Sequence, residues 1–235
     1  YEFKKNHLAK LKRKRIAFIG IPYYFVKVVK YLKKNKINST VIFINYHPNK
    51  ILRWFLHLNL LNKLICSLLF PGTNIHYYKV SSHIQLKDIV LNNSFDIGFH
   101  KIPGIIPENI SGKFSDGLIN DHWGLLPDLK GRSTILYSIL LNAPVIISNH
   151  FIEKSIDAGN IVNYTKLDIF KNWSFANKVN LHLTFPHRVI NSLCSYYHNN
   201  GPIAINSSRL GKVYYEIHPV LKRFIITNSL SVYSH

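Results

Sequence analysis

The chain alternates short apolar runs with longer amphipathic stretches, and this alternation limits its possible folds more than any other feature. Residues 15–20 (RIAFIG) form an apolar run of β type that ends in glycine, and apolar residues at helical spacing follow over residues 22–35. Further apolar runs predict strands at residues 39–45, 75–80 and 95–99. Strands that alternate with helices form a parallel sheet covered on both faces, so we expect an α/β fold.

The second half of the chain continues this pattern. It predicts strands at residues 117–120, 145–152 and 161–166, and helices at residues 133–142 and 175–197. Beyond the last of these helices, the pattern changes to short β-like runs such as KVYYEI. We therefore expect a basic segment at residues 1–14, one main domain at residues 15–200 and a small β-containing tail at residues 201–235.

The longest apolar stretch covers residues 51–70. Polar and charged residues interrupt it at Arg53, His57, Asn59, Asn62 and Lys63. Each of these side chains is costly at the centre of a bilayer, so the stretch is not expected to span a membrane. Its apolar residues recur at helical spacing and predict an amphipathic helix that packs on the sheet.

Basic residues far outnumber acidic ones. The chain has 30 Lys and Arg against 11 Asp and Glu, a formal charge of +19. Such a charge attracts nucleic acid, anionic membranes and phosphorylated metabolites alike, so it does not identify a partner. Cys66 and Cys194 stand alone in apolar helical patterns, which excludes a disulfide framework. Because the apolar run after the basic N-terminal residues is too short for a signal peptide, the cytoplasm is the expected location.

Common nucleotide-binding motifs are missing from the sequence. After the first predicted strand, GIPYY at residues 20–24 lacks the second and third glycines of a dinucleotide-binding turn. The sequence also lacks the GxxxxGK[ST] loop of ordinary NTPases. The 13 histidines do not have metal-ligand spacing, so we predict no metal site.

A polar cluster follows the strand predicted at residues 117–120. The sequence NDHWGLLPDLKGRS begins there and places Asn120 and His122 two residues apart. Side chains at this spacing on a strand point to one side, here at the carboxyl edge where open α/β sheets bind ligands. An isolated pair of this kind is more often an edge histidine beside a turn-capping asparagine than an active site.

A second stretch changes this interpretation. HFIEKSIDAGNI at residues 150–161 places Asp157 in a glycine-containing loop just past another predicted strand. Together the two stretches resemble the signature of the folate-dependent formyltransferases, which have N-x-H, L-L-P-x-x-x-G, a helix, a strand that ends in His, and an I-D-x-G loop. The resemblance covers about residues 15–170 and implies a Rossmann-like α/β fold, a mostly parallel sheet flanked by helices, with a small C-terminal β appendage.

The resemblance also implies an active site. It places Asn120, His122 and Asp157 on the catalytic Asn, His and Asp of the family. The implied formyl donor is N10-formyltetrahydrofolate, whose chemistry requires no metal. The segment FDIGFHKIPGIIP at residues 95–107 matches the family's strand and loop around the pterin. The cofactor-binding residues expected on this basis are Phe99, His100, Lys101, Ile102 and Ile156.

The chemistry explains why such residues are needed. A neutral amine attacks the formyl carbon, and the oxyanion that forms needs preorganised donors, here the Asn120 amide and a protonated His122. Asp157 is expected to hold the His122 imidazolium or an ordered water that accepts the amine proton. The sequence departs from the family pattern at Asp121 and at the pair Trp123-Gly124. The resemblance therefore implies the catalytic residues but does not specify the shape and charge of the substrate pocket.

The three residues Asn120, His122 and Asp157 do not by themselves identify the amine that receives the formyl group. Glycinamide ribonucleotide transformylases usually bind a phosphate with a loop rich in Gly, Asn and Ser, where this chain has GIPYY. Methionyl-tRNA formyltransferases carry an RNA-binding barrel, for which the residues after Gly201 are too few. The chain thus resembles most the sugar N-formyltransferases, which act on substrates such as dTDP-4-amino-4,6-dideoxyglucose and serve the synthesis of surface polysaccharides.

The expected partner is therefore a nucleotide-linked amino sugar of the dTDP type, with no nucleic acid and no membrane span. The expected assembly is a homodimer. The substrate-binding residues expected are Lys79, Trp123, Tyr214 and Tyr215. A tyrosine of this tail either stacks on the base or simply packs in its strand. Two alternatives stay open: transfer to methionyl-tRNA or glycinamide ribonucleotide, and a basic nucleic-acid-binding module without catalysis on the same fold.

Overall fold

The computed structural model divides the chain into two compact units, Tyr1–Asn120 and Asp121–His235. The helix predicted at residues 51–70 lies outside the described residues, except for Leu68, and so does Cys66. No helix in the described ranges is long and apolar enough to cross a membrane. The ranges that the structure describes are residues 9–44, 68, 77–80, 82–102, 105–167, 175–206 and 211–228.

The first unit contains a parallel sheet. Strand β1 (Ile16–Gly20) pairs in parallel with β2 (Ser39–Ile44) on one side and with β4 (Ile97–Lys101) on the other. Strand β3 (Tyr77–Val80) pairs with β2, and β5 (Gly117–His122) pairs with β4. The strand order is therefore β3-β2-β1-β4-β5, and all these pairings are parallel, as the sequence predicted.

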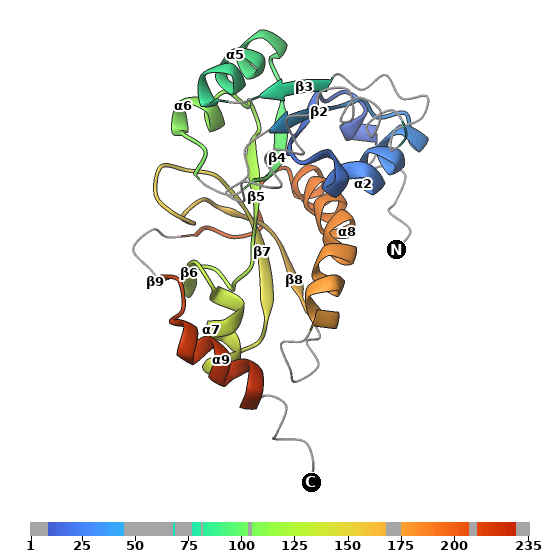
Figure 1. The fold of residues 1–235 in the computed structure, drawn as a ribbon. Coiled ribbons are helices and arrows are strands. Elements are labelled where there is room, and N and C mark those ends of the chain that lie inside the picture. Colours follow the sequence, from blue (N-terminus) through green and yellow to red (C-terminus); the bar gives the residue numbers. More distant parts are fainter. Residues whose placement is uncertain are drawn as a thin grey trace. The chain divides into compact units, whose positions relative to one another are not determined.

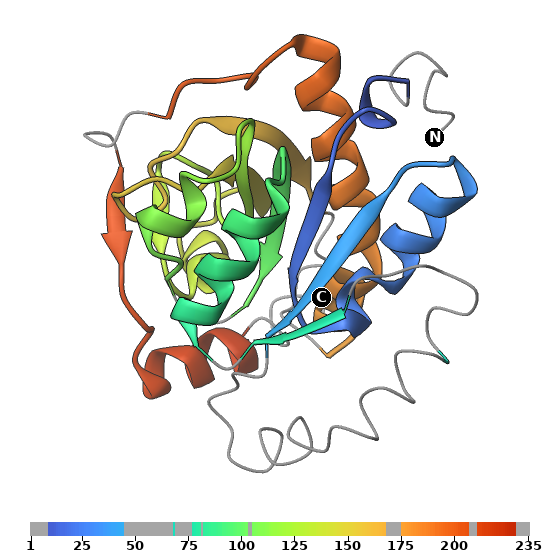
Figure 2. The ribbon, with the colours of Figure 1, turned by 90° about the horizontal axis from the view of Figure 1, so that it is seen from above.

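Helices accompany these strands. Helix α2 (Pro22–Lys34) begins with a proline, whose missing N–H is not needed in the first turn of a helix. It buries Phe25, Val28 and Leu32, and it lies beside β2 in Figure 2. Helix α5 (His83–Asn93) was not predicted from the sequence, because only Leu86 and Val90 are buried along it. The short α6 (Glu108–Ser111) precedes β5.

The second unit begins inside β5, whose last two residues are Asp121 and His122. In strand order β5 is followed by β7 (Ile146–Phe151) and β8 (Ile161–Lys166), and β7 pairs with β8 in the antiparallel direction. Helix α8 (Phe175–Asn199) runs beside β8 in Figure 1. The Ser195 hydroxyl of α8 donates to the Val162 carbonyl of β8 at 3.1 Å. The sheet is thus mostly parallel, with one antiparallel edge strand.

The tail after α8 contains both a strand and a helix. Strand β9 (Lys212–Tyr214) pairs with β6 (Leu129–Gly131), which gives the small C-terminal strand pair. Helix α9 (Pro219–Asn228) packs on α7 (Thr134–Leu140) in Figure 1. The sequence predicted only β-like runs here. It missed α9 because Val220 and Phe224 are 70% and 55% exposed, which blurs the amphipathic pattern.

These observations confirm the predicted fold class, a mostly parallel α/β sheet flanked by helices with a small C-terminal strand pair. The predicted division of the chain at residues 14 and 200 stays a prediction. Cys194 lies in α8 and is 3% exposed, and burial raises the pKa of its thiol to about 12. It is therefore a core residue rather than a reactive thiol.

A buried ion pair joins β5 to α8 in the second unit. The side chains of Asp121 and Arg188 are 0% and 1% exposed, and Arg188 donates from Nε to Oδ1 and from Nη2 to Oδ2, both at 2.9 Å. Asn149 Nδ2 and Trp123 Nε1 donate to the same carboxylate at 3.0 and 2.9 Å. Asp121 is one of the departures from the family pattern, and its carboxylate is buried and paired with Arg188.

Replacing one partner of this pair should destabilise the fold strongly. We expect Arg188→Met to lower the free energy of unfolding by about 3–5 kcal/mol, because it leaves the Asp121 carboxylate buried without its cation. The matched control is Arg132→Met, which removes an exposed ion pair with Glu216 at 3.3 Å and should cost under about 1 kcal/mol. Urea unfolding measures both, and equal losses in the two variants would contradict the prediction.

Candidate functional site

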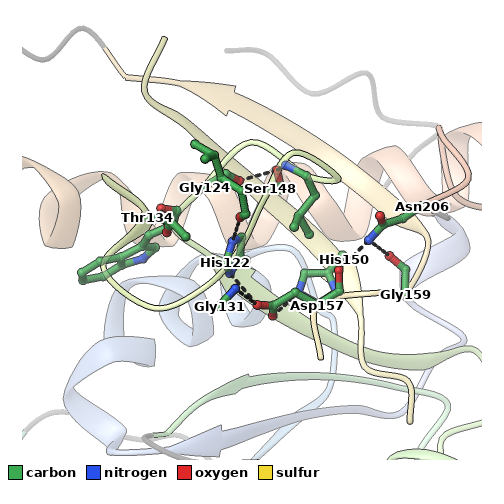
Figure 3. A network of polar contacts seen from close by, with 12 residues as sticks. His122, Gly124, Gly131, Thr134, Ser148, His150, Asp157, Gly159 and Asn206 are labelled. Carbon is green, nitrogen blue, oxygen red and sulfur yellow. Dashed lines mark hydrogen bonds and ion pairs between the residues drawn. The ribbon is translucent and has the colours of Figure 1, made fainter. Parts of the chain in front are cut away.

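His122 is the last residue of β5, and its side chain is 5% exposed. Its Nε2 lies 2.7 Å from the Leu129 carbonyl oxygen, a contact in which Nε2 carries the proton and donates. Its Nδ1 lies 3.4 Å from Asp157 Oδ2, as Figure 3 shows. The Leu129 carbonyl thus fixes the ring orientation and leaves Nδ1 facing the carboxylate.

Asp157 lies in the loop that follows β7. Its φ of 48° is in the left-handed region, which costs energy for a residue with a β-carbon. Its Oδ2 accepts a hydrogen bond from the Gly131 N–H at 2.7 Å, and its Oδ1 lies 3.5 Å from His150 Nε2. The carboxylate is therefore held between two imidazoles and one backbone amide.

His150 is the functional residue that the sequence analysis did not select. It lies in β7, its side chain is 3% exposed, and its Nδ1 is 2.7 Å from the Phe151 carbonyl oxygen. Its ring centroid is 6.0 Å from that of His122, with the rings nearly perpendicular. The signal that could have identified it was present in the family pattern, which includes a strand that ends in His.

The two titratable partners respond differently to burial. For His122, burial is the largest effect and lowers the pKa, although the Asp157 charge opposes it. For Asp157, burial alone would raise the pKa, but the hydrogen bond with His150, the charges of both imidazoles and the Gly131 amide lower it to about 2. Near pH 7 Asp157 is therefore ionised, and burial favours the neutral form of His122.

The turn between β5 and α7 is itself held by side-chain hydrogen bonds. Ser148 Oγ accepts from the Leu126 N–H at 3.0 Å and donates to the Gly124 carbonyl at 2.7 Å. Thr134 Oγ1 donates to the Trp123 carbonyl. A β-carbon on Gly124 would lie 2.8 Å from His122 Nε2, so glycine is required there by close approach rather than by a left-handed backbone.

The structure brings His122 and Asp157 together, and Asn120 precedes His122 by two residues on the same strand. Asn120 is half-buried and stands opposite His100 in the register of β4 and β5. The catalytic roles of these three residues stay a proposal.

The residues expected to bind the cofactor differ in accessibility. Phe99 and His100 lie inside β4 and are 0% and 5% exposed, so they present little or no surface to a ligand. Lys101 and Ile102 are half-buried at the carboxyl end of that strand, and Ile156 is 54% exposed beside Asp157.

The contacts described for the expected substrate-binding residues differ from one residue to the next and do not join them in one cluster. Lys79 lies in β3, and its side chain falls outside the described part of the chain. The indole N–H of Trp123 donates to Asp121, and its ring packs on a buried apolar cluster. The Tyr214 ring lies 4.4 Å from that of Tyr137, centroid to centroid, whereas Tyr215 is 79% exposed. Among the described side chains, no group of three or more His, Cys, Asp or Glu is arranged to hold a metal ion.

Comparison with known proteins places this arrangement on a known fold. No protein-family model and no curated protein matches the sequence. A sugar N-formyltransferase from Shewanella sp. has a similar structure, with a TM-score of 0.63 and 16% sequence identity. The superposition covers 94% of this chain and 90% of the Shewanella chain. An N-formyltransferase from Helicobacter canadensis, in complex with folinic acid and dTDP-3-aminofucose, matches 86% of this chain over 70% of its own, at 20% identity and a TM-score of 0.56.

The same fold occurs in an enzyme with another acceptor. A glycinamide ribonucleotide transformylase from Symbiobacterium toebii matches 80% of this chain over 88% of its own, at 11% identity and a TM-score of 0.59. The resemblance to the formyltransferases is therefore confirmed at the level of the fold. Because formyltransferases for different amines share it, the fold alone does not select the acceptor.

Gly124→Ala should disturb the orientation of His122. The new β-carbon would meet His122 Nε2, the Leu129 oxygen and Thr134 Cβ at 2.8 Å each, so we expect a loss of about 1–3 kcal/mol in stability. The control is Gly112→Ala, where φ is −70° and the nearest atom is a Glu108 oxygen at 3.1 Å. Urea unfolding and the NMR signal of the His122 ring test this. An unchanged ring signal in Gly124→Ala would contradict it.

Asp157→Asn should remove a pH-dependent part of the stability. The pKa of Asp157 is about 2 in the folded protein against its ordinary value of 3.8. The ionised carboxylate therefore stabilises the fold above about pH 4, and this contribution disappears as the pH falls toward about 2. It amounts to about 2 kcal/mol. Unfolding free energies measured from about pH 6 to about pH 2 should converge by that amount for the two proteins. Parallel curves would show that Asp157 does not have a lowered pKa.

Proposed function

We propose that the protein transfers a formyl group from N10-formyltetrahydrofolate to the amine of a nucleotide-linked amino sugar. The observation that carries the proposal is the ionised Asp157 carboxylate, held between the buried imidazoles of His122 and His150 in the loop after β7. Such a group can take part in general-base catalysis, in which the attacking amine loses a proton. The fold shared with a sugar N-formyltransferase supports the reaction class.

In the first unit, Lys101 and Ile102 at the carboxyl end of β4 are half-buried and offer the folate donor a cation and an apolar side chain. In the second unit, the exposed Ile156 beside Asp157 offers an apolar side chain. Phe99 and His100 support the end of β4 from within the sheet. The donor supplies the activated formyl group. The protein must stabilise the oxyanion and accept the proton of the amine.

Negative charge develops on the formyl oxygen as the amine attacks the formyl carbon. We assign its stabilisation to the side-chain amide of Asn120, which stands at the end of β5 two residues before His122. A preorganised donor of this kind is typically worth about 3 kcal/mol in the transition state. The amide needs no change of protonation to act, so its contribution does not depend on pH.

We assign the proton of the amine to the His122–Asp157 pair. Burial favours neutral His122, its Nε2 proton is held by the Leu129 carbonyl, and its Nδ1 is therefore the basic nitrogen. When Nδ1 takes the proton, Asp157 Oδ2 at 3.4 Å stabilises the imidazolium. The proton then passes to N10 of the folate as the bond between N10 and the formyl carbon breaks, so the amine loses one proton and N10 gains one.

This assignment differs from the role that the sequence suggested for His122. A protonated His122 was expected to donate to the oxyanion. Burial lowers the pKa of His122, and the nitrogen that carries its proton already donates to Leu129. Proton acceptance is therefore the role that the geometry favours.

The choice of a sugar acceptor rests on two observations. The Helicobacter canadensis neighbour is a complex with dTDP-3-aminofucose. In this chain, Tyr215 of the tail is 79% exposed, so its ring is accessible for stacking on a base. A dTDP-linked substrate also suits a chain with a formal charge of +19. Homodimer formation and a part in surface polysaccharide synthesis stay predictions.

A competitive assay tests the proposal. With N10-formyltetrahydrofolate and moderate salt, we expect dTDP-4-amino-4,6-dideoxyglucose to have a higher kcat/KM than methionyl-tRNA or glycinamide ribonucleotide, since salt screens unspecific attraction of polyanions. Asn120→Ala should lower kcat by about 10²–10³-fold. The control Asn199→Ala changes an exposed residue at the end of α8 and should keep normal turnover.

The outcomes separate the parts of the proposal. If a non-sugar acceptor has the highest kcat/KM, the sugar assignment is wrong and the formyltransferase assignment stands. If mass spectrometry detects no formyl gain on any acceptor, the formyltransferase assignment is wrong. Normal turnover of Asn120→Ala would remove Asn120 from the oxyanion role.

A further inference from the structure

A residue of the tail holds the loop that carries Asp157. Asn206 follows α8 in the chain and is 4% exposed. Its side-chain Nδ2 donates to the main-chain carbonyl oxygen of Asp157 at 2.8 Å and to that of Gly159 at 3.0 Å, as Figure 3 shows. Its backbone N–H donates to Asn160 Oδ1 at 3.3 Å. One side chain therefore engages both ends of the short segment that begins at Asp157.

Backbone hydrogen bonds fix the position of Asn206 itself. The Ile161 N–H donates to the Ala204 carbonyl at 2.9 Å, and the Ile203 N–H donates to the Ile161 carbonyl at 2.7 Å. These bonds form an antiparallel bridge between the tail and the first residue of β8. Asn206 is thus held two residues beyond a sheet-like contact and is not part of a free chain end.

The loop at Asp157 needs such an anchor. Asp157 has a φ of 48°, a left-handed conformation that is unfavourable for a residue with a β-carbon. At Gly159 a β-carbon would lie 1.8 Å from the Phe151 carbonyl oxygen, so the loop passes very close to the end of β7. Asp157 and Gly159 lie between strands β7 and β8, and a buried main-chain carbonyl needs a donor. Asn206 supplies that donor at two of them.

We propose that Asn206 is a positioning residue for Asp157, so that the tail takes part in the active site. The inference rests on the proposed function of Asp157. Asn206 holds the main chain of Asp157, while His150, His122 and Gly131 contact its carboxylate. Those carboxylate contacts are 2.7 to 3.5 Å long, so a small shift of the loop main chain weakens all of them together.

A graded series of variants tests the inference. Asn206→Ala removes both side-chain donors, whereas Asn206→Ser keeps one shorter donor. We expect kcat to fall about 10- to 100-fold in Asn206→Ala, with KM within about twofold, and to recover partly in Asn206→Ser. The acid limb of the pH profile of kcat should move to lower pH in Asn206→Ala, because the Asp157 charge that raises the pKa of His122 is no longer held against the ring. Asn199→Ala is the matched control, since Asn199 is exposed at the end of α8.

A second measurement does not depend on activity. NMR titration of the His122 and His150 rings, assigned with His122→Gln and His150→Gln, reports whether Asp157 still faces them. Altered titration of both rings in the Asn206 variants, with unchanged titration in Asn199→Ala, supports the inference even if no acceptor is formylated. Unchanged ring titration in Asn206→Ala, or kcat within twofold of the wild type with the same pH profile, overturns it. If Asn206→Ala does not fold, the same criteria apply to Asn206→Ser.

Discussion

The second unit is organised around the buried carboxylate of Asp121. A carboxylate with no exposed surface is costly unless donors surround it, and here they come from separate elements: Arg188 from α8, Asn149 from β7 and Trp123 from the turn after β5. Arg188 donates to both oxygens, Asn149 to Oδ1 and Trp123 to Oδ2, so β5, β7 and α8 are held in one arrangement. An apolar residue at position 121 would leave the Arg188 guanidinium buried without its anion.

This network and the candidate active site use neighbouring residues of the same strands. Asp121 and Asn149 bond to each other, and the next residue on each strand, His122 and His150, faces Asp157 instead. Successive side chains on a strand point to opposite faces, which separates the two sets. The imidazoles are thus carried by strand ends whose other face is fixed by a buried, charge-neutral network. Such support keeps reacting groups in place without using groups that must change protonation.

The electrostatics of the site depend on one carboxylate, that of Asp157, which contacts the imidazoles of both His122 and His150. Both rings have one nitrogen at a backbone carbonyl and the other toward Asp157, at 3.4 and 3.5 Å. Two buried imidazolium ions with centroids 6.0 Å apart would repel each other, and the charge of His150 indeed lowers the pKa of His122. The pair is therefore suited to receive one proton and to release it, which is what formyl transfer between amines requires.

The sequence alone determined the elements whose signal is local. The strand predicted at residues 161–166 is β8 with the same bounds, and the motif spacing led to His122 and Asp157, because period-two alternation and strand-end motifs are written in consecutive residues. The sequence did not reveal α5 or α9, whose apolar patterns are weak. It also did not reveal that Asp121 points inward to Arg188, or that His150 and Asn206 contact Asp157. The Arg188–Asp121 and Asn206–Asp157 contacts join residues 67 and 49 positions apart, and the directions of Asp121 and His150 depend on which face of each strand is buried. Only tertiary packing decides such contacts, because a side chain acquires its partner and its pKa when the fold removes water from around it.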